Sequence, residues 1–353
     1  MHAKRPTIDD VARLSGVARV TVSRVLNGGP NVRGEIRARV MKAVETLDYK
    51  VNPQARSLAG GASRLLAFVC ASDPEREPNS YYEAALELGA LRACLDLGYQ
   101  VLVHNAPRQT PDPQKRIVEL IASQRCQGLI LAPPYSDDVE LIDAAQARGC
   151  QVVSVSPGGP GRGRADAVGV DDEAGGYDIG RALLALGHRR FGFIAGLEEH
   201  LSADQRLRGF QRALAEEGLG RADYAMARGD FTFRSGVTLA PTLLDHPLRP
   251  TALVCANDDT AAGALSAAHA RGLGIPSDLS ISGFDDAPVA GIVWPPLTTV
   301  RQPVKALGQR AVELLVARLT GTETSPEPVF QQLEHTVVTR QTTGPVSRSS
   351  RLP

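Results

Sequence analysis

From Arg64 onward, short apolar runs alternate with longer stretches of helical periodicity, and this alternation strongly constrains the fold. The apolar runs predict buried strands at Leu65–Cys70, Val101–Asn105, Gly128–Ala132, Val152–Ser156, Phe191–Ala195, Ala252–Ala256 and Ser280–Phe284. Helical stretches lie between them, among them Tyr82–Leu97, Ala174–Leu186, Arg206–Glu217 and Thr260–Arg271. Strands that alternate with helices in this way form parallel sheets covered on both faces, and the units suffice for two doubly wound lobes.

The charge of the chain is divided between a short N-terminal part and the remainder. Residues 1–61 carry 11 Lys and Arg against 5 Asp and Glu, whereas the other 292 residues carry 28 against 34. A small basic module typically binds a polyanion such as nucleic acid. A chain of 353 residues is also longer than a single hydrophobic core usually supports, so we expect a small basic domain joined to a larger one.

The basic part has the pattern of three short helices. Thr7 to Asp10 predicts a capping box, in which the Thr hydroxyl and the Asp carboxylate each bind a free backbone N–H. Gly16 permits a tight turn before a second helix from about Arg19 to Leu26, and a third helix runs from about Gly34 to Leu47. Two short helices joined by a glycine turn and supported by a third form a helix-turn-helix motif.

The second of these helices carries the side chains suited to reading DNA. Val22, Val25 and Leu26 are expected to face inward, and the outward residues are Arg19, Val20, Thr21, Ser23 and Arg24. Side chains near the N-terminus of such a helix contact base edges in the major groove. Arg can bind O6 and N7 of guanine with two hydrogen bonds, and Val can contact the thymine methyl group.

These motifs and their order closely resemble the N-terminal part of the LacI/GalR-type transcriptional regulators. Thr7 to Ala12, Gly16-Val17 and Thr21 to Asn27 resemble the head, and Asn52 to Gly60 resembles the hinge helix. The resemblance implies that Leu58 pries open a base step in the minor groove, with the small Ala59 beside it. Together, the candidate DNA-binding residues are Thr7, Arg19, Val20, Thr21, Ser23, Arg24, Asn27, Arg33, Asn52, Ala55, Leu58 and Ala59.

Three positions in the head depart from the family pattern. Ala18 stands where these proteins usually carry a Ser that caps the recognition helix, a cap worth roughly 1 kcal/mol. Arg33 and Ile36 replace a Ser and a Thr that commonly help to cap the third helix and to touch phosphate. The charge of Arg33 can restore a phosphate contact. We expect normal folding of the head but do not carry over the family's phosphate contacts at these positions.

The resemblance continues to about residue 340 and implies a periplasmic-binding-protein-like domain with a ligand cleft between two lobes. It is carried by Val170 to Gly176, Leu186 to Arg190, Arg206 to Phe210, Cys255 to Asp258, Gly283 to Asp286 and Pro296 to Pro303. The candidate effector-binding residues are Asp73, Tyr82, Ser154, Arg206, Phe231, Asn257, Asp285 and Trp294.

The cleft candidates suit a polyhydroxylated ligand. Arg206 and Asp285 can bind neighbouring hydroxyl groups through charge-assisted hydrogen bonds, and Phe231 can cover an apolar ring face. The alternatives are a structural ion pair between Arg206 and Asp285, and core packing for Phe231 and Trp294. Ser154 stands where sugar-binding members often show an acidic residue, which leaves a non-sugar effector open.

We therefore expect an α/β chain with an all-α head: an N-terminal helix-turn-helix domain followed by a two-lobed, doubly wound parallel-sheet domain. The expected boundaries are a head at 1–50, a hinge helix and linker at 51–62, an effector-binding and dimerisation domain at 63–345, and a tail at 346–353. Within the large domain, lobe 1 is expected at about 63–160 and 291–322, and lobe 2 at about 161–290 and 323–345.

The sequence argues against an enzyme. It holds no GxSxG elbow, P-loop or HExxH motif, and its histidines are scattered, so we expect no catalytic residue, metal or cofactor. Gly158 to Gly163 lacks the spacing of a dinucleotide-binding loop and is interpreted as a flexible crossover. The 5 cysteines are spread among apolar residues, which is typical of buried, reduced thiols.

The expected function is sequence-specific regulation of transcription by a homodimer on a palindromic operator of double-stranded DNA. The expected role is repression of genes for carbohydrate catabolism or uptake, with a sugar or glycoside as the effector. The alternatives are a non-sugar effector or corepressor, or a small-molecule receptor without a DNA function. The first ten residues are polar and no apolar run reaches the ~20 residues that span a bilayer, so we expect a cytoplasmic, nucleoid-associated protein.

Overall fold

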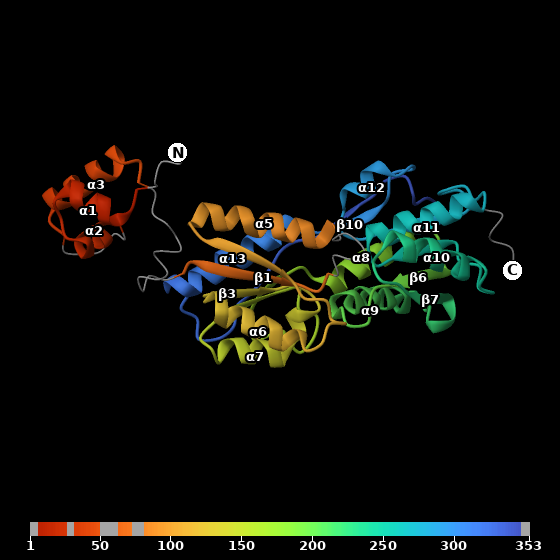
Figure 1. The fold of residues 1–353 in the computed structure, drawn as a ribbon. Coiled ribbons are helices and arrows are strands. Elements are labelled where there is room, and N and C mark those ends of the chain that lie inside the picture. Colours follow the sequence, from red (N-terminus) through yellow and green to blue (C-terminus); the bar gives the residue numbers. More distant parts are fainter. Residues whose placement is uncertain (1–5, 27–31, 50–62, 73–80, 347–353) are drawn as a thin grey trace. The chain divides into compact units, whose positions relative to one another are not determined.

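The computed structural model describes residues 6–26, 32–49, 63–72 and 81–346 (Figure 1). Its chain divides into two compact units, Met1–Ser63 and Arg64–Pro353, and each is described here by itself. The first unit is all helical and the second contains parallel sheets, so the predicted fold class is confirmed. The expected hinge helix at 51–62 lies outside the described residues.

The head consists of α1 (Ile8–Ser15), α2 (Arg19–Leu26) and α3 (Gly34–Thr46). The predicted capping box is present, since the Thr7 hydroxyl accepts a hydrogen bond from the Asp10 N–H and the Asp10 carboxylate accepts one from the Thr7 N–H. Gly16 ends α1 in the left-handed conformation that glycine favours. A small core holds the helices together, formed by Val11, Val22, Val25, Val40 and Ala43.

The first lobe is built on a six-stranded sheet in the order β11-β5-β4-β3-β1-β2, in which all pairs are parallel. Its strands are β1 (Leu65–Cys70), β2 (Gln100–Asn105), β3 (Gly128–Leu131), β4 (Gln151–Val155), β5 (Asp166–Gly169) and β11 (Phe330–Gln332). Alternate residues of β1 enter opposite clusters: Phe68 packs with α5 (Tyr81–Leu97) and α13 (Val304–Thr320), and Val69 packs with α6 (Pro113–Gln124) and α7 (Val139–Gln146). The sheet is therefore covered on both faces, as its apolar strands predict.

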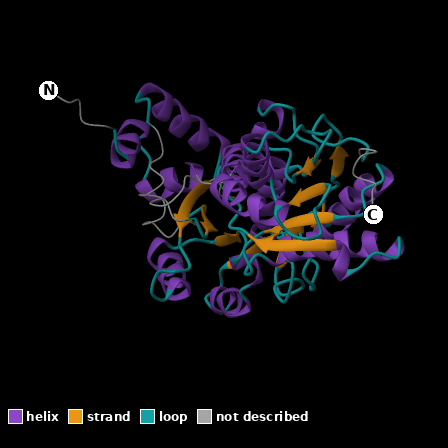
Figure 2. Cartoon of the chain, turned by 90° about the vertical axis from the view of Figure 1, so that its right-hand side faces the viewer, coloured by secondary structure: helices purple, strands orange, loops and turns teal. Residues whose placement is uncertain are grey.

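The second lobe repeats this plan around a parallel four-stranded sheet in the order β7-β6-β8-β9. Its strands are β6 (Phe191–Ala195), β7 (Tyr224–Arg228), β8 (Ala252–Cys255) and β9 (Ser280–Ser282). One face carries α8 (Asp172–Ala185) and α9 (Leu201–Glu216), and the other carries α10 (Phe233–Leu244) and α11 (Asp258–Ala270) (Figure 1). In Figure 2, helices (purple) lie above and below the strands (orange). Short helix α12 (Pro288–Ile292) and the antiparallel pair of β10 (Thr299–Arg301) and β12 (Thr336–Val338) complete this lobe.

The chain passes between the two lobes later than the sequence predicts. The crossings lie between Gly169 and Asp172, between Arg301 and Val304, and between Gln332 and Thr336, instead of near residues 160, 290 and 322. The expected lobe boundaries were wrong because β5 and β11 extend the sheet of the first lobe, and because β10 joins the core of the second.

The glycine-rich segment 158–163 is not the crossover that the sequence suggested. The Asp137 carboxylate accepts hydrogen bonds from the N–H groups of Gly158, Gly159 and Gly161, at 2.9, 2.8 and 3.2 Å. These bonds tie the segment to the first lobe, and the chain then returns to that lobe's sheet as β5.

Three helix pairs meet through glycines, one from each helix. A Cβ atom on any of these glycines would lie 1.8–2.1 Å from a backbone oxygen of the partner helix, so the two backbones are in direct contact. The pairs are Gly89 of α5 with Gly308 of α13, Gly176 of α8 with Gly209 of α9, and Gly236 of α10 with Gly263 of α11. Such contact fixes the distance between the helices more tightly than interdigitated side chains do.

The side chains of all five cysteines are buried and unpaired, which confirms the prediction of buried thiols. Within the described ranges, no helix is long and apolar enough to cross a membrane.

Candidate DNA-reading helix and effector cleft

Helix α2 presents the expected face for DNA. Val22 and Val25 are buried in the core of the head, whereas Arg19, Val20 and Arg24 are exposed, Val20 to 66%. An exposed apolar Val beside two Arg side chains fits a helix that reads base edges better than a merely solvated surface. The Arg19 Nε lies 3.6 Å from the Asp9 Oδ1, a weak pair at the surface that leaves the guanidinium available to DNA.

The departures from the family pattern have visible structural effects. Ala18 provides only its backbone carbonyl to the start of α2, where it accepts hydrogen bonds from the N–H groups of Thr21 and Val22. Arg33 precedes α3 without forming a side-chain cap.

Thr7, another predicted DNA contact, is exposed and is engaged with Asp10 in the capping box. Thr21 and Ser23 are half-buried on α2, and the remaining DNA candidates, Asn27, Asn52, Ala55, Leu58 and Ala59, lie outside the described residues.

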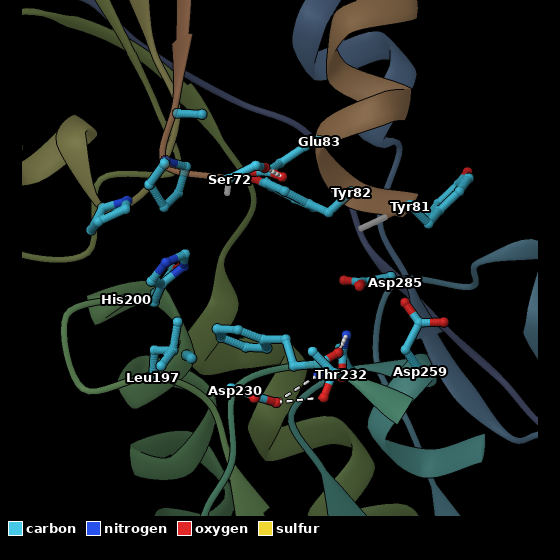
Figure 3. Close-up of a pocket in the computed structure, with 18 of the residues that line it drawn as sticks. Ser72, Tyr81, Tyr82, Glu83, Leu197, His200, Asp230, Thr232, Asp259 and Asp285 are labelled. Carbon is cyan, nitrogen blue, oxygen red and sulfur yellow. Dashed lines mark hydrogen bonds between the residues drawn. The ribbon is translucent and has the colours of Figure 1, made fainter. Parts of the chain in front are cut away.

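In the second unit, a cavity of about 720 Å³ lies between the two sheets (Figure 3). The first lobe contributes Ser72 after β1, Tyr81 to Glu83 at the start of α5, Arg108 after β2, and Pro133 and Pro134 after β3. The second contributes residues after β6, β7, β8 and β9, among them His200, Asp230, Asn257 and Asp285. All follow the carboxyl ends of parallel strands, which is where open α/β sheets bind ligands.

The structure brings together five of the eight predicted effector residues. Tyr82, Arg206, Phe231, Asn257 and Asp285 line the cavity. Asp73 lies outside the described residues.

The structure places Ser154 and Trp294 elsewhere. Ser154 is fully buried inside β4, where its hydroxyl has no hydrogen-bond partner among the described residues. Ser156, just beyond that strand, accepts a hydrogen bond from the Tyr82 hydroxyl at 3.1 Å. Trp294 is 76% exposed and does not line the cavity.

Arg206 is held rigidly at the floor of the cavity. Its Nε donates to the Asp172 Oδ1 at 2.8 Å, and its Nη1 donates to the Ala256 carbonyl at 2.7 Å. Asp285 lies 3.9 Å from the same Nη1, and the guanidinium lies over the Phe284 ring. Arg206 therefore forms a structural ion pair with Asp172 and also places hydrogen-bond donors beside the cavity.

Asp285 is almost completely buried, and burial raises the pKa of its carboxyl to about 7, although the Arg206 charge and a 2.6 Å hydrogen bond from Gln302 act in the opposite direction. His200 lies across the cavity, and burial lowers its pKa to about 4, which keeps its imidazole neutral at neutral pH. The polar groups of the cavity thus include both a neutral imidazole and a carboxyl that can accept or donate hydrogen bonds.

Asn257 positions Phe231 and caps α11. Its Oδ1 accepts from the Thr260 N–H, and its Nδ2 donates to the Phe231 carbonyl at 2.9 Å. Phe231 has a φ of 67°, and its ring packs so closely on Gly196 that a Cβ there would lie 2.0 Å from it. Asn257 therefore acts on the cavity through the ring that it holds in place.

Two family models match the chain: "Bacterial regulatory proteins, lacI family" at residues 7–52 and "Periplasmic binding protein-like domain" at residues 181–343. The transcriptional regulator CelR of Thermobifida fusca is 32% identical, over 96% of this chain and 98% of its own. The chain belongs to the lacI family. GalR of Salmonella typhimurium is 33% identical, over 97% of this chain and 98% of its own. This lacI-family protein is accordingly a transcriptional regulator with a DNA-binding head.

Solved structures of relatives share the fold of this lacI-family protein. The lac repressor dimer bound to operator and the anti-inducer ONPF matches with a TM-score of 0.82, at 29% identity over 97% of this chain and all of that one. A CelR–cellobiose complex matches with a TM-score of 0.73, at 31% identity over 96% of this chain and all of that one.

The cleft of this lacI-family protein contains charged and aromatic residues that the sequence did not single out. Tyr81, Glu83, Arg108, His200 and Asp259 all line it. Each lies within one turn or loop after a strand or beside a predicted site residue, so a search of every such loop for polar side chains would have found them. Tyr81 and Glu83 flank Tyr82, and Asp259 follows Asn257 by two residues.

Proposed function

We propose that this protein binds operator DNA as a homodimer and that a small ligand in the cleft between its lobes controls operator affinity. The observation that carries the proposal is the combination, in one chain, of a helix-turn-helix head and a 720 Å³ cavity lined by both lobes. A ligand in this cavity touches both lobes, so its binding depends on the angle between them. Coupling of that kind is worth roughly 1–3 kcal/mol, a change in operator affinity of about 5- to 150-fold.

The proposed ligand is a sugar or glycoside, and the proposed role is repression of genes for carbohydrate catabolism or uptake. Arg206 and Asp285 offer charge-assisted hydrogen bonds to hydroxyl groups, and Phe231 offers an apolar face to a sugar ring. The relative CelR forms a complex with the disaccharide cellobiose, which supports a ligand of this class. A non-sugar effector or a corepressor is the alternative.

Exposed apolar side chains on both lobes support the homodimer. On the second lobe, Ile292 and Trp294 are 78% and 76% exposed, and on α5 of the first lobe Leu91 and Leu95 are exposed as well. Helices α5 and α12 both lie along the upper side of this unit in Figure 1. Exposed apolar surface of this kind typically marks a protein interface.

A regulator that binds DNA acts where the nucleoid is, so we place this protein in the cytoplasm.

A titration that measures operator affinity in the presence of candidate ligands identifies the effector. A fluorescently labelled operator and the full-length protein are titrated with glycosides, sugar phosphates and nucleobases. We expect one sugar to change the dissociation constant for operator by about 5- to 150-fold. Asp285→Asn should abolish this response, whereas Asp245→Asn, an exposed carboxylate paired with Arg271 far from the cavity, should preserve it. An unchanged response in Asp285→Asn would contradict the proposed cleft.

Arg24→Ala should separate specific from non-specific DNA binding. We expect a loss of about 1–3 kcal/mol on the operator, because a bidentate contact to a guanine is removed, and little change on unrelated DNA. Fluorescence anisotropy at fixed salt measures both affinities. Arg13→Ala is the matched control, since Arg13 is an exposed arginine on α1. Equal losses on both DNAs would show that Arg24 contacts phosphate only.

A further inference from the structure

The two ends of the cleft differ in charge. His200 and Leu197 lie at one end in Figure 3, and Tyr81, Asp259 and Asp285 lie at the other. At the His200 end, Arg108 and Glu199 both line the cavity and act on His200 with opposite sign, so these two charges offset each other. Asp259 has no such opposite charge beside it among the described residues.

Asp259 and Asp285 have unused hydrogen-bonding capacity. The Oδ1 of Asp285 accepts from Gln302, but its other oxygen accepts no hydrogen bond from any residue in the described ranges, although the side chain is almost fully buried. Asp259, in the first turn of α11, forms no hydrogen bond or ion pair with the described part of the chain. Both carboxylates line the cavity, and Asp259 acts electrostatically on Asp285.

The nearby arginines do not neutralise this end. Arg206 donates to Asp172, which does not line the cavity, at 2.8 Å, and lies 3.9 Å from Asp285. Arg301 and Arg340 both pair with Asp286. Asp258 lies behind the cavity wall, where Ala287 N–H and the Thr299 hydroxyl donate to it. One guanidinium therefore serves several carboxyl groups at this end of the cavity.

We propose, on the basis of the ligand cleft proposed above, that the effector carries a protonated amine, as an amino sugar does, and that Asp259 and Asp285 bind this amine. Buried carboxylates require an opposite charge to remain ionised, and an ammonium group provides both that charge and hydrogen-bond donors. The Tyr81 ring at the same end suits a cation as well. A phosphorylated sugar would place like charges together at this end.

Calorimetric titration of the full-length protein with matched ligands tests this inference. The pairs are glucosamine and glucose, galactosamine and galactose, and the β-1,4-linked glucosamine disaccharide and cellobiose. We expect the amino member of one pair to bind at least tenfold more tightly than its neutral partner. The N-acetylated form of that ligand, which has the same ring but no charge, should lose this advantage.

Two variants with the same loss of charge locate the amine. Asp259→Asn should reduce the affinity for the amino ligand about tenfold and leave the affinity for its neutral partner unchanged. Asp245→Asn removes an exposed carboxylate that does not line the cleft and should change neither affinity. Melting temperatures of the unliganded variants show whether each is folded.

Three results would overturn the inference. Equal or tighter binding of the neutral members would reject the amine and leave the proposed sugar-responsive function standing. Equal effects of Asp259→Asn and Asp245→Asn would show that the preference comes from long-range charge and would exclude the assigned contact. Binding of no member of any pair would reject the amino sugar and count against a sugar effector altogether.

Discussion

Arg206→Ala should lower the free energy of unfolding of the two-lobed unit by about 3–5 kcal/mol and abolish the response to ligand. Arg206 is buried, and its Nε lies 2.8 Å from the Oδ1 of Asp172, which is only 2% exposed. Removing the arginine leaves the Asp172 carboxylate buried without its cation, which is far costlier than losing a pair at the surface. It also removes the donor beside Asp285 at the cavity floor.

The matched control lies two turns later on the same helix. Arg212 forms a 2.6 Å pair with Glu173, and both side chains are substantially exposed, at 48% and 38%. Arg212→Ala should therefore cost less than about 1 kcal/mol, because water replaces the lost partner. Urea unfolding followed by circular dichroism measures both variants. Similar losses in the two would show that burial of the Arg206–Asp172 pair does not set its contribution.

Gly209→Ala should destabilise the second lobe by at least about 3 kcal/mol. Added atoms in a packed core usually cost about 1–3 kcal/mol, because neighbouring side chains can rearrange. Here the new methyl group would lie 1.8 Å from the Glu173 carbonyl oxygen and 2.7 Å from the Tyr177 N–H nitrogen. Both are backbone atoms of α8, so relief requires that the two helices move apart and that the cluster beneath them loosens.

Gly291→Ala is the control for this substitution. It adds the same methyl group to α12, where nothing lies within 4 Å of the new atom. We expect unchanged or slightly higher stability, since alanine is favoured over glycine within a helix by roughly 0.5–1 kcal/mol. Thermal unfolding of both variants at one scan rate gives the comparison. A melting temperature of Gly209→Ala close to that of Gly291→Ala would show that α8 and α9 separate at little cost.

Much of the architecture was predictable because the buried strands carry a strong local signal. Runs such as Leu65–Cys70 and Phe191–Ala195 are apolar on both faces, and the structure has strands with these same bounds. The head was predictable for a different reason, since the capping box and the turn at Gly16 depend on neighbouring residues only. Five of the cleft residues followed from a resemblance that spans nearly the whole chain.

The lobe boundaries depend on contacts between distant residues, and the local pattern did not reveal them. Strand β5 is only the four residues Asp166–Gly169 and becomes a strand by pairing with β4. Strand β11 has the polar sequence Phe-Gln-Gln and is defined by its register against β5. Ser154 shows the same limit of sequence-based prediction. It is fully buried within β4, whereas Ser156, two residues later in the chain, is the hydrogen-bond partner of Tyr82.

The direct backbone contacts within the helix pairs determine how ligand binding can be transmitted. A shear motion requires layers of side chains that slide past one another by changing rotamers, and at the glycine contacts no such layer separates α8 from α9 or α5 from α13. Each lobe should therefore turn as a single block. Rotation is then confined to the short crossings at 170–171, 302–303 and 333–335, which act as hinges. A small ligand bound between the two lobes thereby changes the angle between them. This rotation produces larger displacements in the parts of each lobe that lie farther from the hinges.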